Sequence, residues 1–150
     1  MSALESSSPE ETRRLGEALG RAAQAGDVIL LSGELGAGKT VFVQGMARGL
    51  DFQGPVSSKS FVLLGEYVGR LTLFHADLYR LDSPTEVEDL ALEEISRDGI
   101  LVVEWPERGD VVLPGERLTL RFEVNGPETR RITAEAKGAR ARALAEALGK

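Results

Sequence analysis

The residues with the clearest chemical potential lie between positions 33 and 40. The segment Gly33-Glu34-Leu35-Gly36-Ala37-Gly38-Lys39-Thr40 fits G-x-x-x-x-G-K-[ST], the phosphate-binding loop of nucleoside triphosphatases. Glycines allow backbone N–H groups to turn inward around a phosphate. Lys39 would reach the β- and γ-phosphates, and the Thr40 hydroxyl would ligate the Mg²⁺ that bridges them. The segment therefore predicts a bound nucleoside triphosphate with a divalent metal.

The residues on either side of this loop have the pattern that its chemistry requires. Residues 27–32 form an apolar, β-branched run typical of a strand, and residues 40–50 have helical spacing. A helix that begins at the loop would add its positive N-terminal end to the phosphate site. This order of strand, loop and helix disfavours the alternative of a glycine-rich turn that binds nothing.

Two acidic residues could complete the site on the metal side. Asp77 follows the apolar run 71–76, and Glu104 follows the run 100–103. Either carboxylate could hold Mg²⁺, directly or through water, or orient an attacking water. His75, the single histidine, could act as a general base, but a local hydrogen bond is the simpler interpretation. Arg80 could face a phosphate or pair with a nearby acid.

Composition limits the class of protein. The chain has 150 residues, no cysteine, a net charge of −6 and 42% hydrophobic residues. These values favour a single domain over 1–150, with residues 1–7 as a flexible tail, and exclude disulfides and thiolate metal sites. The acidic balance argues against a large nucleic-acid surface. Because we find neither a signal peptide nor an apolar run of membrane-spanning length, we expect a cytoplasmic protein with no membrane contact.

The remaining pattern predicts an α/β fold, in three layers with helices on both faces of a mixed sheet. Strands 27–32 and 100–103 would form its parallel centre, because the second run is continuously apolar. Two hairpins would add antiparallel strands, the second turning at Asn125-Gly126. The predicted elements are a helix from Pro9 capped by Ser8, a hairpin over 60–75, a helix over 84–95, a hairpin over 118–136 and a helix over 139–148.

Four segments together resemble the TsaE (YjeE) family of bacterial tRNA threonylcarbamoyladenosine biosynthesis ATPases. They are the loop at 33–40, residues 56–61, the H-x-D-L-Y-R-L run at 75–81 and the V-E-W-P-E run at 103–107. The loop alone is shared by very many enzymes, whereas the combination of the last two segments is highly specific. Their order and spacing extend the resemblance over residues 9–136.

The resemblance implies a P-loop ATPase that binds ATP or ADP with Mg²⁺ and works with TsaB- and TsaD-like partners. That assembly places threonylcarbamoyl on N6 of adenosine 37 in tRNA, which the ATPase itself would contact only through the complex. By motif position, Thr40 and Glu104 would be Mg²⁺ ligands, Asp77 would support the metal or the water, and Lys39 would act in catalysis. The nucleotide would lie against Thr12, Glu34, Leu35, Gly36, Ala37, Gly38, Lys39, Thr40, Val41 and an arginine of the last strand, Arg131 or its neighbour Arg130.

One segment departs from the family pattern. Where the family has S-P-T-F, this chain has Ser58-Lys59-Ser60-Phe61. Lys59 removes a fixed backbone angle and adds a charge, which affects the mechanics of this segment more than nucleotide binding. Two other functions use the same loop: a small-molecule kinase, and a regulatory module that binds a nucleotide without hydrolysing it. The kinase is disfavoured because the acidic stretch 82–98 offers little to a phosphorylated acceptor.

Overall fold

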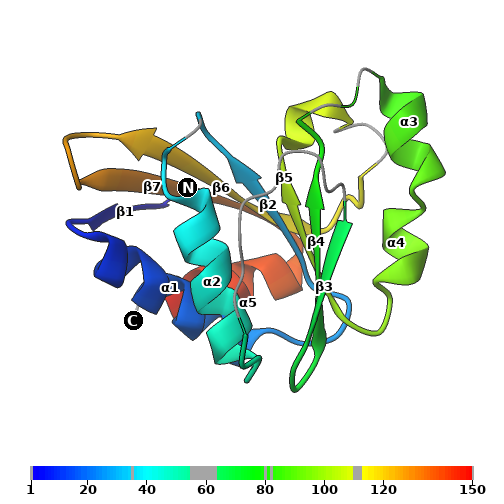
Figure 1. Ribbon diagram of the computed structural model, residues 1–150, viewed down its shortest axis with the longest axis horizontal. Helices are drawn as coiled ribbons and strands as arrows, with labels where there is room; N and C mark the ends of the chain where they lie inside the picture. The colour runs from blue at the N-terminus through cyan, green and yellow to red at the C-terminus, as the bar shows by residue number, and fades with distance from the viewer. Residues whose placement is uncertain are drawn as a thin grey trace.

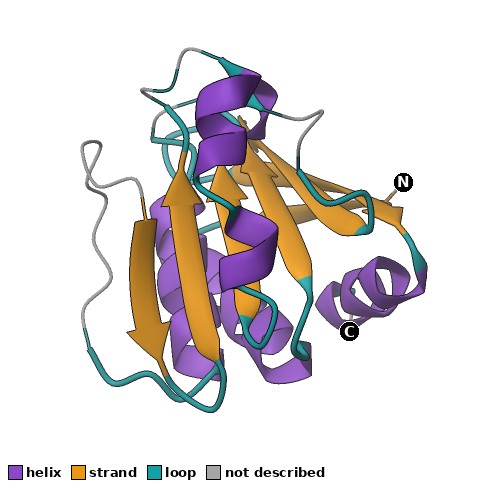
Figure 2. Ribbon diagram, turned by 90° about the vertical axis from the view of Figure 1, so that its right-hand side faces the viewer, coloured by secondary structure: helices purple, strands orange, loops and turns teal. Residues whose placement is uncertain are grey.

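The structure is a computed structural model that describes residues 2–34, 36–54, 64–79, 81, 83–109 and 113–149. These residues form one seven-stranded sheet with helices on both faces (Figures 1 and 2), which confirms the predicted α/β fold. The elements are β1 (Ser2–Ser6), α1 (Pro9–Ala22), β2 (Val28–Ser32), α2 (Lys39–Gly49), β3 (Leu64–Val68), β4 (Thr72–Asp77), α3 (Pro84–Asp89), α4 (Leu92–Ile95), β5 (Ile100–Glu104), the 3₁₀ turn η1 (Pro106–Arg108), β6 (Arg117–Val124), β7 (Arg130–Lys137) and α5 (Ala139–Leu148).

The sheet has the order β1-β7-β6-β2-β5-β4-β3. Strand β2 pairs in parallel with both β5 and β6, and β4 pairs in parallel with β5, so the predicted parallel centre is confirmed. β3, β7 and β1 are the antiparallel additions. Because β2, β4 and β5 are parallel, their C-terminal ends meet at one edge, where open α/β sheets bind ligands.

Two hydrophobic cores hold the helices against the sheet. Helices α1, α2 and α5 cover one face, where Leu19, Phe42 and Leu144 belong to the larger core. Helices α3 and α4 cover the other face through Val87 and Leu92. Residues of β5 alternate between the two cores, which explains why its apolar run is unbroken. The same alternation places Glu104 on the face of the sheet that α2 covers.

Helices α1 and α2 pack unusually closely because each presents glycines to the other. Gly16 and Gly20 of α1 lie against Gly45 and Gly49 of α2. A Cβ atom at Gly45 would collide with the carbonyl oxygen of Arg13, so the backbones meet without side chains between them. This contact fixes the start of α1 beside the start of α2.

Two of our expectations about local structure were wrong. Residues Ser2–Ser6, expected to be a tail, form the edge strand β1, because their backbone pairs with β7 in register Leu4 to Ile132. The helix expected over 84–95 is broken into α3 and α4, since Ala91 adopts a left-handed backbone with φ of 51°. Within the described part of the chain, no helix is long and apolar enough to cross a membrane.

Candidate nucleotide-binding site

The phosphate-binding loop connects the end of β2 to the start of α2, as its motif predicts. Gly33 and Gly38 have φ of 138° and 100°, a region that favours glycine. Gly38 is the N-cap of α2, and within the described residues no side chain caps its backbone. The first N–H groups of α2 are therefore available to an anion, as phosphate binding at a helix N-terminus requires. Leu35 lies outside the described residues.

Lys39 is folded back over its own loop. Its Nζ donates a hydrogen bond to the carbonyl oxygen of Gly33 at 2.5 Å and lies 4.2 Å from the centre of the Trp105 ring. The side chain is buried, and this burial lowers the pKa of Lys39, although the carboxylates Glu104, Asp77 and Glu107 oppose the shift. The ammonium group thus lies within electrostatic reach of three acids and is held by a carbonyl and a ring.

Asp77 and Glu104 are brought together as the sequence predicted. They occupy paired positions at the ends of β4 and β5. Glu104 is buried, and Asp77 is half-buried and accepts a hydrogen bond from the Tyr79 N–H at 3.0 Å. Burial raises the pKa of Asp77, and the Glu104 charge adds to the rise, while the Tyr79 N–H, His75 and Lys39 oppose it. Two acids therefore share one small volume beside the ammonium of Lys39.

The donors at this edge suit magnesium. Thr40 stands on the first turn of α2, and its hydroxyl with the two carboxylates gives the oxygen set that Mg²⁺ prefers. Among the described residues, no three His, Cys, Asp or Glu side chains converge closely enough to hold an ion by themselves. Mg²⁺ in nucleotide sites usually takes one or two protein carboxylates and completes its shell with water and substrate phosphates.

The histidine makes a local hydrogen bond, as the simpler interpretation held. His75 Nε2 lies 2.5 Å from Glu104 Oε2, and both side chains are buried. When Glu104 is ionised its carboxylate can only accept, and Nε2 is then the donor. The imidazole therefore faces Glu104 rather than the phosphate loop.

Trp105, which the sequence allowed either as a wall of the site or as a core residue, lies beside the loop lysine. It follows Glu104 with a left-handed backbone (φ of 58°), which turns its ring over Lys39 and against Tyr79, at 4.9 Å between ring centres. The ring borders an open groove of about 460 Å³ that also includes Glu34 and Phe122. The motif gave the position of the tryptophan, but no pattern gave its backbone turn.

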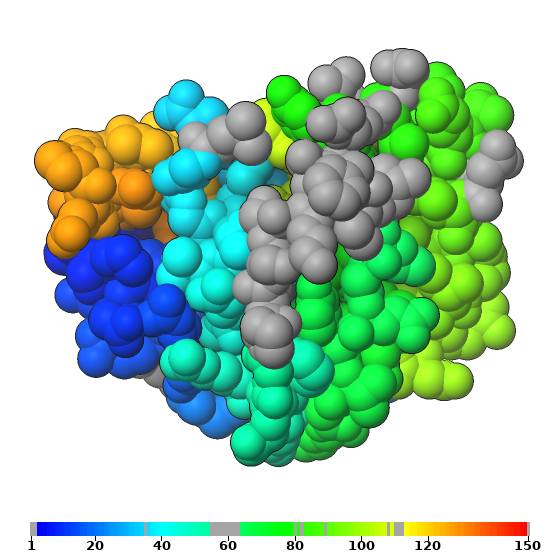
Figure 3. Space-filling view, in the orientation of Figure 1, coloured from blue at the N-terminus to red at the C-terminus, as the bar shows by residue number. Residues whose placement is uncertain are grey.

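Thr12 and an arginine of β7 approach the loop from its other side. Thr12 is buried, with its hydroxyl oxygen 2.7 Å from that of Ser6, and its methyl group lies beside Gly38. Arg130 donates to the Gly36 carbonyl oxygen at 3.2 Å. Figure 3 shows the orange β6–β7 segment directly beside the cyan segment of the loop.

This arrangement corrects the choice between the two arginines. Arg131 is exposed and pairs in register with Glu5 of β1. Since side chains alternate along a strand, only one of two successive arginines can face the loop, and it is Arg130. Ala37 and Lys39 are buried in the loop region, Glu34 and Gly36 are exposed, and Thr40 and Val41 are half-buried. Lys59, Arg80 and Asp82 lie outside the described residues.

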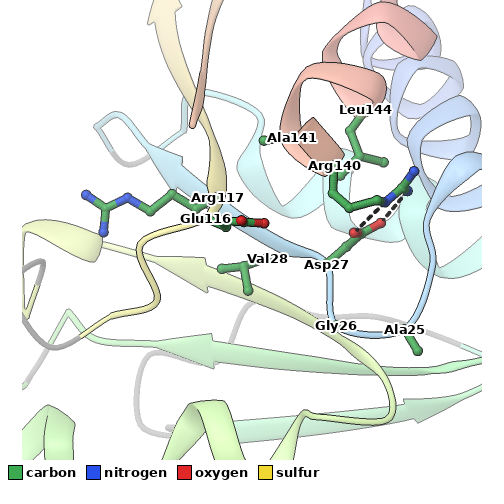
Figure 4. Close-up of a pocket in the computed structure, with 9 residues that line it drawn as sticks. All are labelled: Ala25, Gly26, Asp27, Val28, Glu116, Arg117, Arg140, Ala141 and Leu144. Carbon is green, nitrogen blue, oxygen red and sulfur yellow. Dashed lines mark hydrogen bonds and ion pairs between the residues drawn. The ribbon is translucent and has the colours of Figure 1, made fainter. Parts of the chain in front are cut away.

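A second cavity, of about 110 Å³, lies at the opposite end of β2 (Figure 4). The buried carboxylate of Asp27 accepts hydrogen bonds from Arg140 of α5 at 2.8 and 3.1 Å and from the Gln24 N–H at 2.8 Å. Arg117 points away from this pair (Figure 4). The ion pair between Asp27 and Arg140 therefore ties α5 to the start of β2.

Comparisons with known proteins show which family this chain is similar to. The family model described as "Threonylcarbamoyl adenosine biosynthesis protein TsaE" matches residues 6–132. The tRNA threonylcarbamoyladenosine biosynthesis protein TsaE of Treponema pallidum is 42% identical over 129 residues, 85% of this chain and 96% of that protein. The protein of the same name from Bacillus subtilis is 40% identical over 144 residues, 95% of this chain and 90% of that protein. The crystal structure of Bacillus subtilis YdiB superposes with a TM-score of 0.82 and 35% identity, covering 99% of this chain and 93% of that one. The chain belongs to the TsaE family.

Proposed function

We propose that this protein binds ATP with Mg²⁺, hydrolyses it, and thereby supports threonylcarbamoylation of N6 of adenosine 37 in tRNA. Membership of the TsaE family supports the place in tRNA threonylcarbamoyladenosine biosynthesis. In this proposal TsaB- and TsaD-like proteins carry out the transfer, and tRNA is met through them. The net charge of −6 is in keeping with a protein that does not grip tRNA by itself.

One observation carries the hydrolytic part of the proposal. The ammonium of Lys39 lies within electrostatic reach of Asp77 and Glu104, which are paired at the ends of adjacent parallel strands. The uncapped start of α2 lies on the same side of the sheet. Phosphoryl transfer in P-loop enzymes needs this combination of a lysine, a helix start and an acid at a strand end.

The chain's own residues have distinct tasks in this mechanism. Backbone N–H groups from Gly36 to Thr40 cradle the phosphates, and Lys39 exchanges the Gly33 carbonyl for a phosphate oxygen. Thr40, Asp77 and Glu104 would hold Mg²⁺, which supplies charge neutralisation of the β- and γ-phosphates when bound. The Glu104 oxygen that does not face His75 would hold the metal directly or through a water that it also orients. Trp105 covers Lys39 and keeps water from one side of it.

A nucleotide-binding module that never hydrolyses is the alternative that needs an experiment. Glu104→Gln keeps the size of the side chain but removes the charge that metal and water require. We expect this variant to bind ATP within about threefold of the wild type and to lose about 10²-fold or more of its hydrolysis with TsaB and TsaD present. Absence of ATP turnover by the wild-type protein with its partners would refute hydrolysis and support the regulatory alternative.

A further inference from the structure

The buried pair of His75 and Glu104 has an arrangement that the proposed hydrolysis does not by itself require. His75 belongs to β4 and stands opposite Val102 of β5, two residue pairs before Asp77 and Glu104. Its side chain lies on the same face of the sheet as Glu104, because residues two apart along a strand share a face. The Glu104 side chain turns back along β5 to meet Nε2 at 2.5 Å.

This contact leaves the two oxygens of Glu104 with different tasks. Oε2 is taken by the imidazole, so Oε1 is the atom left for a cation or a water. A glutamate has three rotatable side-chain bonds, and without a partner its carboxylate would sample several directions. The hydrogen bond therefore restricts the carboxylate to one orientation before any ligand arrives, in the way that outer partners orient metal-binding carboxylates.

The position of the imidazole is itself fixed from the other side. Tyr67 of β3 lies against it, with ring centres 6.4 Å apart, and Phe52 packs on Tyr67 at 5.2 Å. Gly65 is the β3 residue paired with His75, and the Tyr67 hydroxyl folds over the space that a side chain there would fill. Burial raises the pKa of Tyr67, and the Glu104 charge adds to the rise, which places the phenol within electrostatic reach of that carboxylate.

A purely structural explanation accounts less well for these facts. The neighbours of His75 on this face, Leu73 and Val102, are fully buried and apolar, so an apolar residue would suit the core at position 75. A buried imidazole is costly unless it is hydrogen-bonded, and its bond goes to Glu104, the buried carboxylate among the described residues of the candidate site. A general-base role is also disfavoured, because Nε2 already donates to Glu104.

The geometry points to His75 as the positioning residue of Glu104: its Nε2–H holds Oε2 and so presents Oε1 to the metal side of the nucleotide. Tyr67, seated over Gly65, keeps the imidazole in place for this bond. The inference rests on the proposed function, because it assigns a task to Oε1 only if a metal–nucleotide complex binds. It makes the row Tyr67, His75 and Glu104 a single unit that crosses β3, β4 and β5.

Variants that differ in the reach of a donor test this inference. In His75→Gln the amide nitrogen stands near the position of Nε2 and still donates. The side chain of His75→Asn is too short to bring its amide nitrogen to that position, and His75→Leu has no donor. Mn²⁺ replaces Mg²⁺ as the probe, and its affinity for the ADP-bound protein is measured by the electron paramagnetic resonance of free Mn²⁺. Thermal unfolding and the kcat and KM for ATP, with TsaB and TsaD, are measured on the same samples.

We expect His75→Gln to stay within about threefold of the wild type in Mn²⁺ affinity and kcat. His75→Leu and His75→Asn should both lose about 10–100-fold in Mn²⁺ affinity and in kcat. Their KM for ATP should change less than about threefold. The inference is overturned if folded His75→Leu or His75→Asn retains wild-type Mn²⁺ affinity and kcat, or if His75→Gln falls as far as they do. Failure of the wild-type protein to bind Mn²⁺ with ADP is a separate result, which would overturn the proposed function and this inference with it.

Discussion

Asp77 and Glu104 stand directly opposite each other at the C-terminal ends of β4 and β5, on the face of the sheet that α2 covers. Two acids at paired positions repel each other, and burial adds to the cost of their charge. In the free protein the ammonium of Lys39 offsets part of this cost. In the proposed function, a bound cation would offset the rest of this cost, as is common where function and stability compete.

The first prediction concerns the stability cost of Asp77. Burial raises its pKa above the ordinary value of 3.8, so the folded protein binds this proton more tightly than the unfolded chain does. Protonated Asp77 stabilises the folded protein at pH values below its ordinary pKa. This contribution is lost as the pH rises through the raised pKa. Asp77→Asn avoids this loss, so its stability gain over the wild type should grow from pH 3 to pH 7, while ATP hydrolysis falls.

Urea unfolding at several pH values measures this difference. Glu88→Gln is the control, because Glu88 is an exposed acid on α3 and its removal should change stability by no more than about 0.5 kcal/mol at any pH. A stability difference for Asp77→Asn that does not vary with pH would contradict the role of burial.

The second prediction uses the single tryptophan of the chain. Lys39 Nζ lies 4.2 Å from the Trp105 ring, and phosphate oxygens should draw it away. We expect ADP with Mg²⁺ to change the tryptophan emission in proportion to the fraction of protein bound. Lys39→Met should have an altered emission before any nucleotide is added, and a smaller further change on binding. An identical ADP-induced change in Lys39→Met and the wild type would show that the signal does not come from this contact.

The third prediction separates two neighbouring arginines. Arg130 joins the β6–β7 hairpin to the Gly36 carbonyl, whereas Arg131 is exposed on the sheet. Arg130→Gln should weaken ADP binding about tenfold. The substitution removes the hydrogen bond to the loop and a positive charge beside the nucleotide. Arg131→Gln should remain within about twofold of the wild type. Calorimetric titration with ADP decides between them, and equal losses in the two variants would be evidence against the assignment to Arg130.

Sequence reasoning found the centre of this site because local patterns define it. The loop at 33–40 has a fixed spacing, and an acid that ends an apolar run, such as Glu104, is visible without coordinates. The choice between Arg130 and Arg131 needed the register of β7, because a shift of one residue reverses which face a side chain takes. The pairing of Ser2–Ser6 with β7 depends on a partner more than 120 residues away, so no local pattern could reveal it.

The close packing of α1 and α2 is likewise a relation between distant residues. Glycine at 16, 20, 45 and 49 lowers helix propensity. Its structural role, which is to let the two backbones pack closely, is visible only in the folded chain. The left-handed turn at Trp105 is similar, since a residue of that size rarely adopts such a backbone and nothing in the sequence marks it.

The fourth prediction tests that helix contact. Gly45→Ala would drive a methyl group into the Arg13 carbonyl oxygen, so we expect a loss of about 1–3 kcal/mol in the free energy of unfolding. Weaker nucleotide binding should accompany it, because α1 carries Thr12 to the loop. Gly115→Ala is the matched control, since nothing lies within 4 Å of a Cβ there, and its stability should change by no more than about 0.5 kcal/mol. Equal stability of the two variants would rule out the tight packing.

In the proposed function, ATP chemistry at Lys39 and Glu104 sustains tRNA modification. The most direct test of this role is threonylcarbamoylation of tRNA over many turnovers, with TsaB, TsaD and ATP, comparing the wild type with Lys39→Ala and Glu104→Gln. We expect repeated turnover with the wild type and, with either variant, a stop near one modification per transferase complex. Undiminished multiple turnover with both folded variants would contradict it.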